Sequence, residues 1–586
     1  MRYWNISKRN NLILVIIAIA TSLLIGCSNA MLKSDASQTP QIVDAILSDP
    51  KTFNPVLTSD ATSSAVVSMM FDGLITQNPI TGETEPALAK SWTVSDDDLE
   101  IVFTLRKDLK WSDGKPLTAD DVVFTFNRLY LNDEIPYNGR ATLKVGESQA
   151  FPQVEKLNDL QIEFTLPEPF APFFDTIGKS ILPKHILEPS VEQRDRDGKL
   201  LIFSTWGVDT PPQKIVGNSA YKMSEYANAQ RIIFTANPYY WKQGENGAEL
   251  PHIKRVVWQI VESTDTSFLQ FRSGGLDSLA ITPEFFSLLK KEADRGNFSV
   301  YNGGAAYGNI YITFNLNQGS RNGKPLVDPV KSRWFNDVRF RQAIAYSIDR
   351  QSIINNLYRG LGQPQNSPIS IQSPFYDDSL PGYDYDIDKA KALFQEAGFT
   401  YNSQQQLVDR DGNRVVFTLN TNAGNKIREG MGSQIKEDLK KVGIRVNYKP
   451  LAFNLLLDLL DNSLQWDCIL LGLTGGNEPN NGANVWYPDG DLHMFNQAKE
   501  DIEGRKVSDW ERQIGQLYIK AAKELDKAKR KEIYAEVQAI ISEKVPFIYL
   551  VNPLSLGAVR DDIQPIEYSA LGGAFWNLEE LKITEQ

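Results

Sequence analysis

Residues 87–128 have the sequence ALAKSWTVSDDDLEIVFTLRKDLKWSDGKPLTADDVVFTFNR, which predicts a strand, a turn and the start of a helix in direct succession. Between Leu99 and Arg106 apolar and polar residues alternate, which is the period of a half-buried strand. Gly114 and Pro116 follow and favour a tight turn. These features describe a scaffold and by themselves indicate no function.

A helix is predicted directly after this turn. Thr118 stands where an N-cap belongs, and Asp120 and Asp121 fall in the first helical turn, where negative charge suits the exposed backbone N–H groups. The apolar residues that follow are spaced along one helix face: Val122, Phe126 and Leu129.

The order of residues in this stretch is more specific than its periodicity. The patterns S-W-x-V-S-x-D, F-x-L-R-K and W-S-D-G-K-P-L-T-A-x-D-V closely resemble the signature of the peptide/nickel family (family 5) of bacterial extracytoplasmic solute-binding proteins, the binding subunits of ABC importers. Other segments also resemble the family pattern: 53–55 (FNP), 181–185 (ILPKH), 231–241 (RIIFTANPYYW) and 335–350 (FNDVRFRQAIAYSIDR). The resemblance covers nearly the whole mature chain.

The resemblance implies an α/β fold of the two-lobed periplasmic binding protein kind (type II), with an additional domain inserted in the first lobe. Laid onto this chain, it gives lobe I at 40–76, 207–304 and 556–586, the additional domain at 77–206, and lobe II at 305–555. Hinge strands are expected near Gly304 and Pro553. The implied function is capture of oligopeptides or peptide-like solutes and their delivery to ABC permease subunits by a monomer, without catalysis and with no cofactor.

One part of lobe II is also predicted by periodicity alone. Val415, Phe417 and Leu419 alternate as a strand, residues 427–442 have a helical apolar period, and a second alternating segment covers 444–448. A βαβ unit of this kind requires a parallel sheet.

The N-terminus resembles a bacterial lipoprotein signal peptide. A basic start precedes an apolar run from Leu12 to Ile25, which is shorter than the ~20 residues of a membrane span. The run ends in L-I-G-C, which resembles a lipobox, so we expect removal of residues 1–26 and lipidation of Cys27. Residues 27–39 would form a tether to a bacterial membrane, placing the protein in the periplasm or at the cell surface. An uncleaved anchor helix is the alternative.

Composition disfavours several classes of function. The 586 residues have a formal net charge of −12, whereas nucleic-acid binding calls for clustered basic charge. Lipidation of Cys27 would leave Cys468 as the only other cysteine, in an apolar run that predicts a buried small side chain. Nucleophile-elbow, Walker, H-E-x-x-H and C-x-x-C motifs are absent and the three His are scattered, so no catalytic residue and no metal site is predicted.

Two loops are expected to face the ligand. One carries Thr58, Ser59 and Asp60 and resembles a family loop that opens toward the cleft, although a helix N-cap cluster explains it equally well. The other runs from Gly472 to Pro479 after a predicted buried strand, and ligands in open α/β sheets bind beyond the carboxyl ends of strands. Its alternative is an ordinary Gly-rich turn. The expected ligand-binding residues are Thr58, Ser59, Asp60, Tyr307, Gly475, Gly476, Asn477, Glu478 and Trp486.

One departure from the family pattern bears on the ligand. Many peptide-binding relatives carry an aspartate in G-W-x-x-D-x-x-(D/E)-P that pairs with the ligand's α-ammonium, whereas this chain has G-L-T-G-G-N-E-P with Gly476 at that place. A buried ammonium without its carboxylate costs roughly 2–5 kcal/mol. Either Glu478 or Asp60 supplies the charge from a shifted position, or the ligand lacks a free amine there. Loss of the anchor by both substitution and shortening favours the second alternative.

Two other functions remain as alternatives. A binder of a nickel complex, haem or an oligosaccharide from the same family would share every motif above. A lipid-anchored hydrolase is disfavoured, because no nucleophile–base motif is present.

Overall fold

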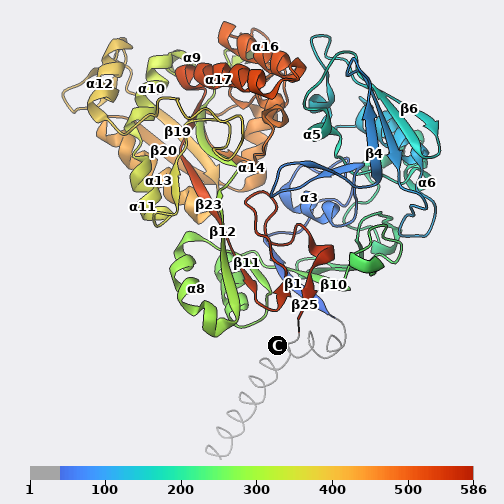
Figure 1. The fold of residues 1–586 in the computed structure, drawn as a ribbon. Helices are drawn as coiled ribbons and strands as arrows, with labels where there is room; N and C mark the ends of the chain where they lie inside the picture. Colours follow the sequence, from blue (N-terminus) through green and yellow to red (C-terminus); the bar gives the residue numbers. More distant parts are fainter. Residues whose placement is uncertain (1–39, 585–586) are drawn as a thin grey trace, which may run out of the picture.

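In the computed structural model, which describes residues 40–584, the chain forms two lobes joined by a pair of long strands (Figure 1). The predicted signal peptide, the lipidation of Cys27 and the tether lie outside the described residues. Within 40–584, no helix combines the length and the apolar character needed to cross a membrane.

Lobe II is built around a five-stranded sheet, in the order β20 (Arg445–Leu451), β19 (Val416–Asn422), β21 (Cys468–Leu473), β13 (Asn309–Phe314) and β22 (Phe547–Tyr549). β19 and β20 are parallel and α13 (Lys426–Lys441) connects them, which confirms the predicted βαβ unit. β13 is antiparallel to both of its neighbours. Cys468 is fully buried in β21, as predicted.

The other helices of lobe II are α9 (Pro329–Asn336), α10 (Val338–Ser347), α11 (Arg350–Leu357), α12 (Ile387–Glu396), α14 (Phe453–Asp458), α15 (Ala483–Trp486), α16 (Asp509–Lys523) and α17 (Lys527–Lys544). Short two-stranded pairs complete it: β14 (Ser320–Arg321) with β15 (Lys324–Pro325), and β17 (Thr400–Tyr401) with β18 (Leu407–Val408). One apolar core, drawn from residues 311–551, fills this lobe.

Lobe I contains a four-stranded sheet, in the order β1 (Gln41–Ile46), β10 (Arg255–Ile260), β9 (Arg231–Ala236) and β8 (Tyr221–Ala227). β1 is parallel to β10 and the other pairs are antiparallel. Its helices are α3 (Ala61–Ser68), α7 (Thr264–Arg272) and α8 (Pro283–Gly296), and the C-terminal segment adds the pair β24 (Ile563–Gln564) and β25 (Lys582–Ile583).

The additional domain has an antiparallel sheet, in the order β4 (Ala89–Val94), β5 (Glu100–Leu105), β7 (Gln161–Thr165) and β6 (Gln153–Asn158). The hairpin of β2 (Ile75–Gln77) and β3 (Thr84–Pro86) begins at the domain's expected boundary with lobe I, and the domain's helices are α4 (Ala119–Phe124), α5 (Phe173–Ile177) and α6 (Lys184–Glu192). Its core is continuous with that of lobe I, because buried residues of both belong to one apolar cluster.

The stretch 87–128 folds as predicted. Alternate residues of β5 are buried, and Thr118 and Asp121 form a reciprocal capping box at the start of α4. The three residues of the predicted helix face are fully buried: Val122, Phe126 and Leu129. From residue 125 to residue 130 the α-helix continues as a wider π-helical turn.

Two strands connect the lobes: β12 (Phe298–Ala305) and β23 (Val551–Arg560). The first residues of β23 pair with β16 (Gly362–Pro364) of lobe II, whereas the later ones pair with β12 and β11 (Ser278–Ala280) of lobe I. The pairing of β12 with β23 is irregular between Asn302 and Ala305, and Gly304 has a φ of +85°. The segments expected to form the hinge therefore lie where the chain passes between lobes. The residue boundaries of the three bodies stay a prediction.

Candidate functional site

A cavity of about 190 Å³ lies in lobe II beside the end of β21. Its walls come from the loop after β21, from α15 and α16, and from β13 and β22. Several of the expected ligand-binding residues line it: Tyr307, Gly475, Gly476, Glu478 and Trp486. Aromatic side chains of neighbouring elements complete the wall: Tyr311, Tyr518, Phe547 and Tyr549. The structure thus brings residues from distant parts of the chain to one place.

The two glycines of the loop after β21 have different roles. A Cβ on Gly475 would lie 1.9 Å from the carbonyl oxygen of Tyr307, so only glycine lets the loop pack against the segment before β13. A Cβ on Gly476 would have Asn481 Nδ2, at 3.8 Å, as its nearest neighbour. The position of the family's aspartate therefore has room for a side chain in this protein.

Glu478 is already paired within lobe II. Arg530 Nη2 donates to Glu478 Oε1 at 2.6 Å, and the Asn480 N–H donates to the same oxygen at 3.1 Å. Burial raises the pKa of Glu478, and the charge of Arg530 opposes this shift. The Arg530 guanidinium also lies over the ring of Phe375, 4.8 Å from its centroid. A carboxylate committed in this way is a poor anchor for a ligand ammonium.

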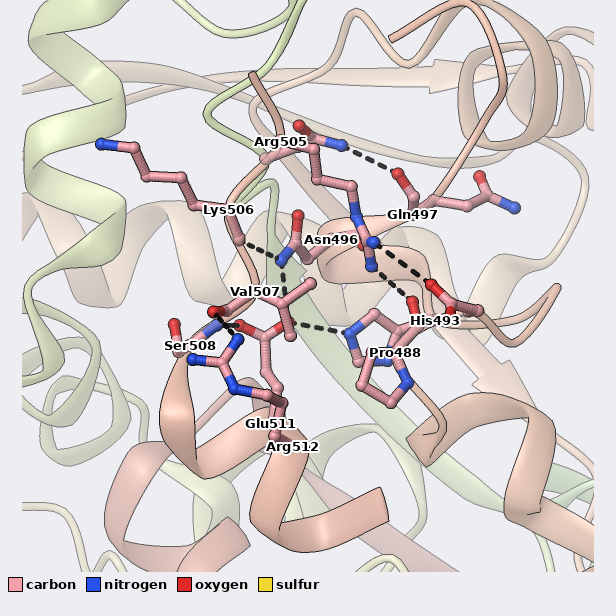
Figure 2. A network of polar contacts seen from close by, with 12 residues as sticks. Pro488, His493, Asn496, Gln497, Arg505, Lys506, Val507, Ser508, Glu511 and Arg512 are labelled. Atoms are coloured by element: carbon pink, nitrogen blue, oxygen red, sulfur yellow. Dashed lines mark hydrogen bonds and ion pairs between the residues drawn. The ribbon is translucent and has the colours of Figure 1, made fainter. Parts of the chain in front are cut away.

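Trp486 ends the short helix α15, and the Val485 carbonyl of this helix joins a buried polar network that reaches α16. His493 lies between two acceptors. Its Nδ1 is 2.8 Å from the carbonyl oxygen of Val485. Its Nε2 is 2.9 Å from Glu511 Oε2 (Figure 2). Asn496 Nδ2 donates to the same carboxylate oxygen at 2.8 Å. Burial opposes ionisation of Glu511, but these hydrogen bonds and one from a backbone N–H outweigh it and lower its pKa. The network fixes the wall of the cavity that carries Trp486.

A larger cavity of about 1080 Å³ lies on the lobe I side. α3, the β2–β3 hairpin, α5 and the C-terminal segment near 572–579 contribute to its lining. Unlike the lobe II cavity, it has many charged side chains: Asp44, Asp72, Glu85, Arg106, Asp175, Lys242 and Glu579.

Two carboxylates of this larger cavity are poorly solvated. Burial raises the pKa of Asp72 to about 6, against hydrogen bonds from neighbouring side chains. Burial also raises the pKa of Asp175, opposed by a hydrogen bond from Gln77 and by the charge of Arg530. Asp175 lies in α5, and Ala171 just before this helix contacts Ala522 of lobe II, so this cavity borders the space between the lobes.

The loop of Thr58, Ser59 and Asp60 lines neither of these two cavities. Asp60 is the N-cap of α3, and its carboxylate accepts hydrogen bonds from the N–H of Ser63 at 2.9 Å and from its hydroxyl at 2.6 Å. Asp60 is therefore committed to a helix cap, which is the alternative that the sequence left open. A role for this loop in ligand binding stays a prediction.

Asn477 lies next to the lobe II cavity, where the lobes approach. Its carbonyl oxygen accepts a hydrogen bond from Ser373 Oγ at 2.6 Å. Its Nδ2 is 3.1 Å from the position that a Cβ would take on Gly82, at the tip of the β2–β3 hairpin. The hairpin of the additional domain thus reaches the loop that carries the expected site.

Direct contacts also join the lobes between α16 and the additional domain. The Ala171 N–H donates to the Ala522 carbonyl at 2.7 Å, and Lys523 Nζ lies 2.5 Å from Glu168 Oε2. Figure 1 shows α5 and α16 facing each other at the end opposite to β12 and β23. The two cavities therefore lie in lobes that touch both at the crossing strands and at the far end.

Two residues of this region could not be found from the sequence. Arg530 is 52 positions from Glu478, and no periodicity links the two. Asp175 lies in a five-residue helix after a proline-rich segment, where nothing marks it as facing lobe II. Only the tertiary arrangement identifies either residue.

The two-lobed α/β fold, with a cavity in each lobe, agrees with a solute-binding component of an ABC importer. The family described as bacterial extracellular solute-binding proteins, family 5 (middle), matches residues 83–492. The chain belongs to this family of non-enzymatic, extracytoplasmic binding proteins, which confirms the resemblance and sets aside the hydrolase alternative.

Several characterised proteins are similar to this chain. A probable ABC transporter-binding protein of Deinococcus radiodurans is 29% identical over 543 residues, covering 88% of each chain. The oligopeptide-binding protein AppA of Bacillus subtilis is 26% identical over 586 residues, covering 95% of each.

Solved structures show the same fold. AppA in complex with a nonapeptide has a TM-score of 0.76 at 23% identity, covering 94% of this chain and 99% of that one. The periplasmic binding protein MelB of Agrobacterium fabrum, in complex with stachyose, has a TM-score of 0.79 at 20% identity, covering 93% and 85%.

Proposed function

We propose that this protein captures oligopeptides or peptide-like solutes between its lobes and delivers them to the permease subunits of an ABC importer. The observation that carries the proposal is the lobe II cavity at the end of β21, which gathers five of the expected ligand-binding residues beside a larger cavity in lobe I. Similarity to the oligopeptide-binding protein AppA supports the peptide class of ligand.

Closure of the lobes is the proposed mechanism. In this mechanism the backbone bends at Gly304–Gly308 and at Asn552–Gly557, where β12 and β23 pass between the lobes. A ligand favours the closed state only through its higher affinity for that state. Small-angle scattering at saturating ligand should show compaction, and an unchanged radius of gyration would contradict closure.

The ligand, in this proposal, has no free amine bound in lobe II. Glu478 is paired with Arg530 and Asp60 caps α3, so neither replaces the aspartate that the family pattern has at Gly476. Backbone-directed hydrogen bonds and bridging water are then the means of holding the peptide chain.

Native mass spectrometry of the protein, purified with whatever it carries, tests the ligand class. We expect added masses that fragment as peptides. The relative in complex with stachyose makes an oligosaccharide the main competing ligand class. A bound sugar, haem or nickel complex would reject the peptide proposal and leave the importer role intact.

A lipid on Cys27 would hold this monomer at the membrane, outside the cytoplasm. Mass spectrometry of the mature protein should find a diacylated N-terminal Cys27 and no residues 1–26. Recovery of an intact Met1, or a Cys27→Ser protein that is processed and anchored normally, would contradict this part of the proposal.

A further inference from the structure

One side of the lobe II cavity is lined by aromatic rings, and the rest of its wall by the glycine-rich loop after β21 and by small or polar residues. These rings support one another: the ring centroids of Tyr311 and Phe547 are 4.5 Å apart, and those of Trp486 and Phe547 are 5.5 Å apart, both in edge-to-face geometry. The polar network around His493 and Glu511 also holds the helix of Trp486 (Figure 2). The aromatic side of the cavity is therefore held in place by these contacts before a ligand binds.

Charge in this cavity is already neutralised. Among the described residues that line it, Glu478 is the one that carries a charge, and Arg530 pairs with it at 2.6 Å. Asn309 also lines the cavity: its Nδ2 donates to the Pro368 carbonyl at 3.2 Å, whereas its Oδ1 is a neutral acceptor without a hydrogen-bond partner in the described part of the chain. A charged ligand group buried here would find no free counter-ion, which is strongly unfavourable.

The volume suits one ring. The cavity measures about 190 Å³, and an apolar cavity of roughly 150 Å³ is enough to bind benzene. We propose that the lobe II cavity is a selective subsite for one uncharged aromatic side chain of the ligand. This inference rests on the proposed peptide-binding function and adds a preference that the family membership does not supply.

Gly482 offers a way to fill the cavity without straining the fold. It lines the cavity, has a φ of −95°, and no atom lies within 4 Å of a Cβ built on it. Gly482→Leu would therefore add an apolar side chain at the cavity wall without a clash at its Cβ. Gly207, in lobe I, supplies a matched control, because its nearest contact would be the Ser204 carbonyl oxygen at 3.8 Å.

The experiment is calorimetry on the full-length mature protein with pools of pentapeptides. A single Phe, Lys or Glu is placed at every position of an alanine background, and all-alanine peptide is the reference. We expect the Phe pool to bind about 10-fold or more tightly than the reference, since phenyl burial is worth about 1.5–3 kcal/mol. The Lys and Glu pools should bind no more tightly than the reference.

Gly482→Leu should reduce the Phe preference to about 3-fold or less, as expected when the space for the ring is filled. The readout is the ratio of Phe-pool to all-alanine affinity within each variant, and Gly207→Leu should keep the full preference. A Phe preference that survives Gly482→Leu, or Lys or Glu pools that match Phe, would overturn the subsite. No binding of any pool to the wild-type protein would reject the peptide-binding function itself. The wild-type ranking remains decisive if the variant does not fold.

Discussion

The two cavities beside the interlobe space differ in both size and charge. The lobe II cavity has about 190 Å³, aromatic walls and one carboxylate that is already paired with Arg530. The lobe I cavity has about 1080 Å³ and more carboxylates than basic groups. A small, rigid and neutral surface discriminates between ligand groups, whereas a large polar one tolerates variety and retains water. On the proposed function, selectivity would come from lobe II and capacity from lobe I.

The largest expected effect comes from removing Arg530, which neutralises the carboxylate of Glu478 in the lobe II cavity. Arg530→Met leaves Glu478 buried without its guanidinium, and loss of one partner of a buried pair costs about 3–5 kcal/mol of unfolding free energy. Urea unfolding followed by tryptophan fluorescence measures this loss. Arg194→Met, which breaks an exposed pair with Glu134, should cost only about 0–1 kcal/mol. Equal losses would show that Glu478 does not depend on Arg530.

The buried carboxyl group of Asp72 in the lobe I cavity should make the unfolding free energy depend on pH. Asp72 has a folded pKa of about 6 against an ordinary value of 3.8, so between these pH values the folded state binds the extra proton. The protonated Asp72 stabilises the folded state fully below about pH 4, and this stabilisation is lost as the pH rises through about 6. The unfolding free energy of the wild type, relative to that of Asp72→Asn, should therefore fall by roughly 2–3 kcal/mol over this range. Urea unfolding at pH 4 and 7 checks this. Exposed Asp159→Asn serves as the control, and a pH-independent difference for Asp72→Asn would contradict the assignment.

Gly476→Asp gives the lobe II wall the carboxylate that the family pattern has there. The position is open, with its nearest contact at 3.8 Å, so the change should fold. We expect the preference for free over N-acetylated Ala-Ala-Phe-Ala-Ala to rise about 10-fold, or about 1.4 kcal/mol. Calorimetry with both peptides measures the ratio, and Gly207→Asp is the control. An unchanged ratio would mean that the ligand's amino end does not approach this position.

The smallest expected effect concerns the contact that joins the lobes. Lys523→Met removes the pair with Glu168, whose side chains are 35% and 18% exposed, at a cost of about 0.2–1 kcal/mol. Because this pair links α16 to the additional domain, the closure mechanism requires that it breaks when the lobes open, so its cost should appear as a loss of ligand affinity of up to about 5-fold. Lys440→Met breaks an exposed pair within α13 and should leave affinity unchanged. Equal ligand affinities for Lys523→Met and Lys440→Met would show that the pair of Lys523 and Glu168 does not contribute to closure of the lobes.

Local rules predicted the scaffold well. The alternation in β5, the capping box of Thr118 and Asp121, and the parallel pairing of β19 with β20 all depend on residues close in sequence. The position of the candidate site at the end of β21 also followed from a general rule about α/β sheets.

The chemistry of the site could not be predicted to the same extent. Gly475 and Gly476 are adjacent and identical in sequence, yet one is pressed against Tyr307 and the other is open. The sequence offers Glu478 as one possible replacement anchor, but the fold pairs it with Arg530. Such properties depend on contacts between distant segments, which neither periodicity nor spacing encodes.

A crystal structure of the protein with the ligand that it carries from the cell is the most direct test of the contrast between the lobes. We predict a peptide-like ligand between the lobes, with an uncharged aromatic side chain among Tyr311, Trp486 and Phe547 and the remainder along the lobe I cavity. A ligand held wholly within the lobe I cavity, or a charged group seated in the lobe II cavity, would contradict the account.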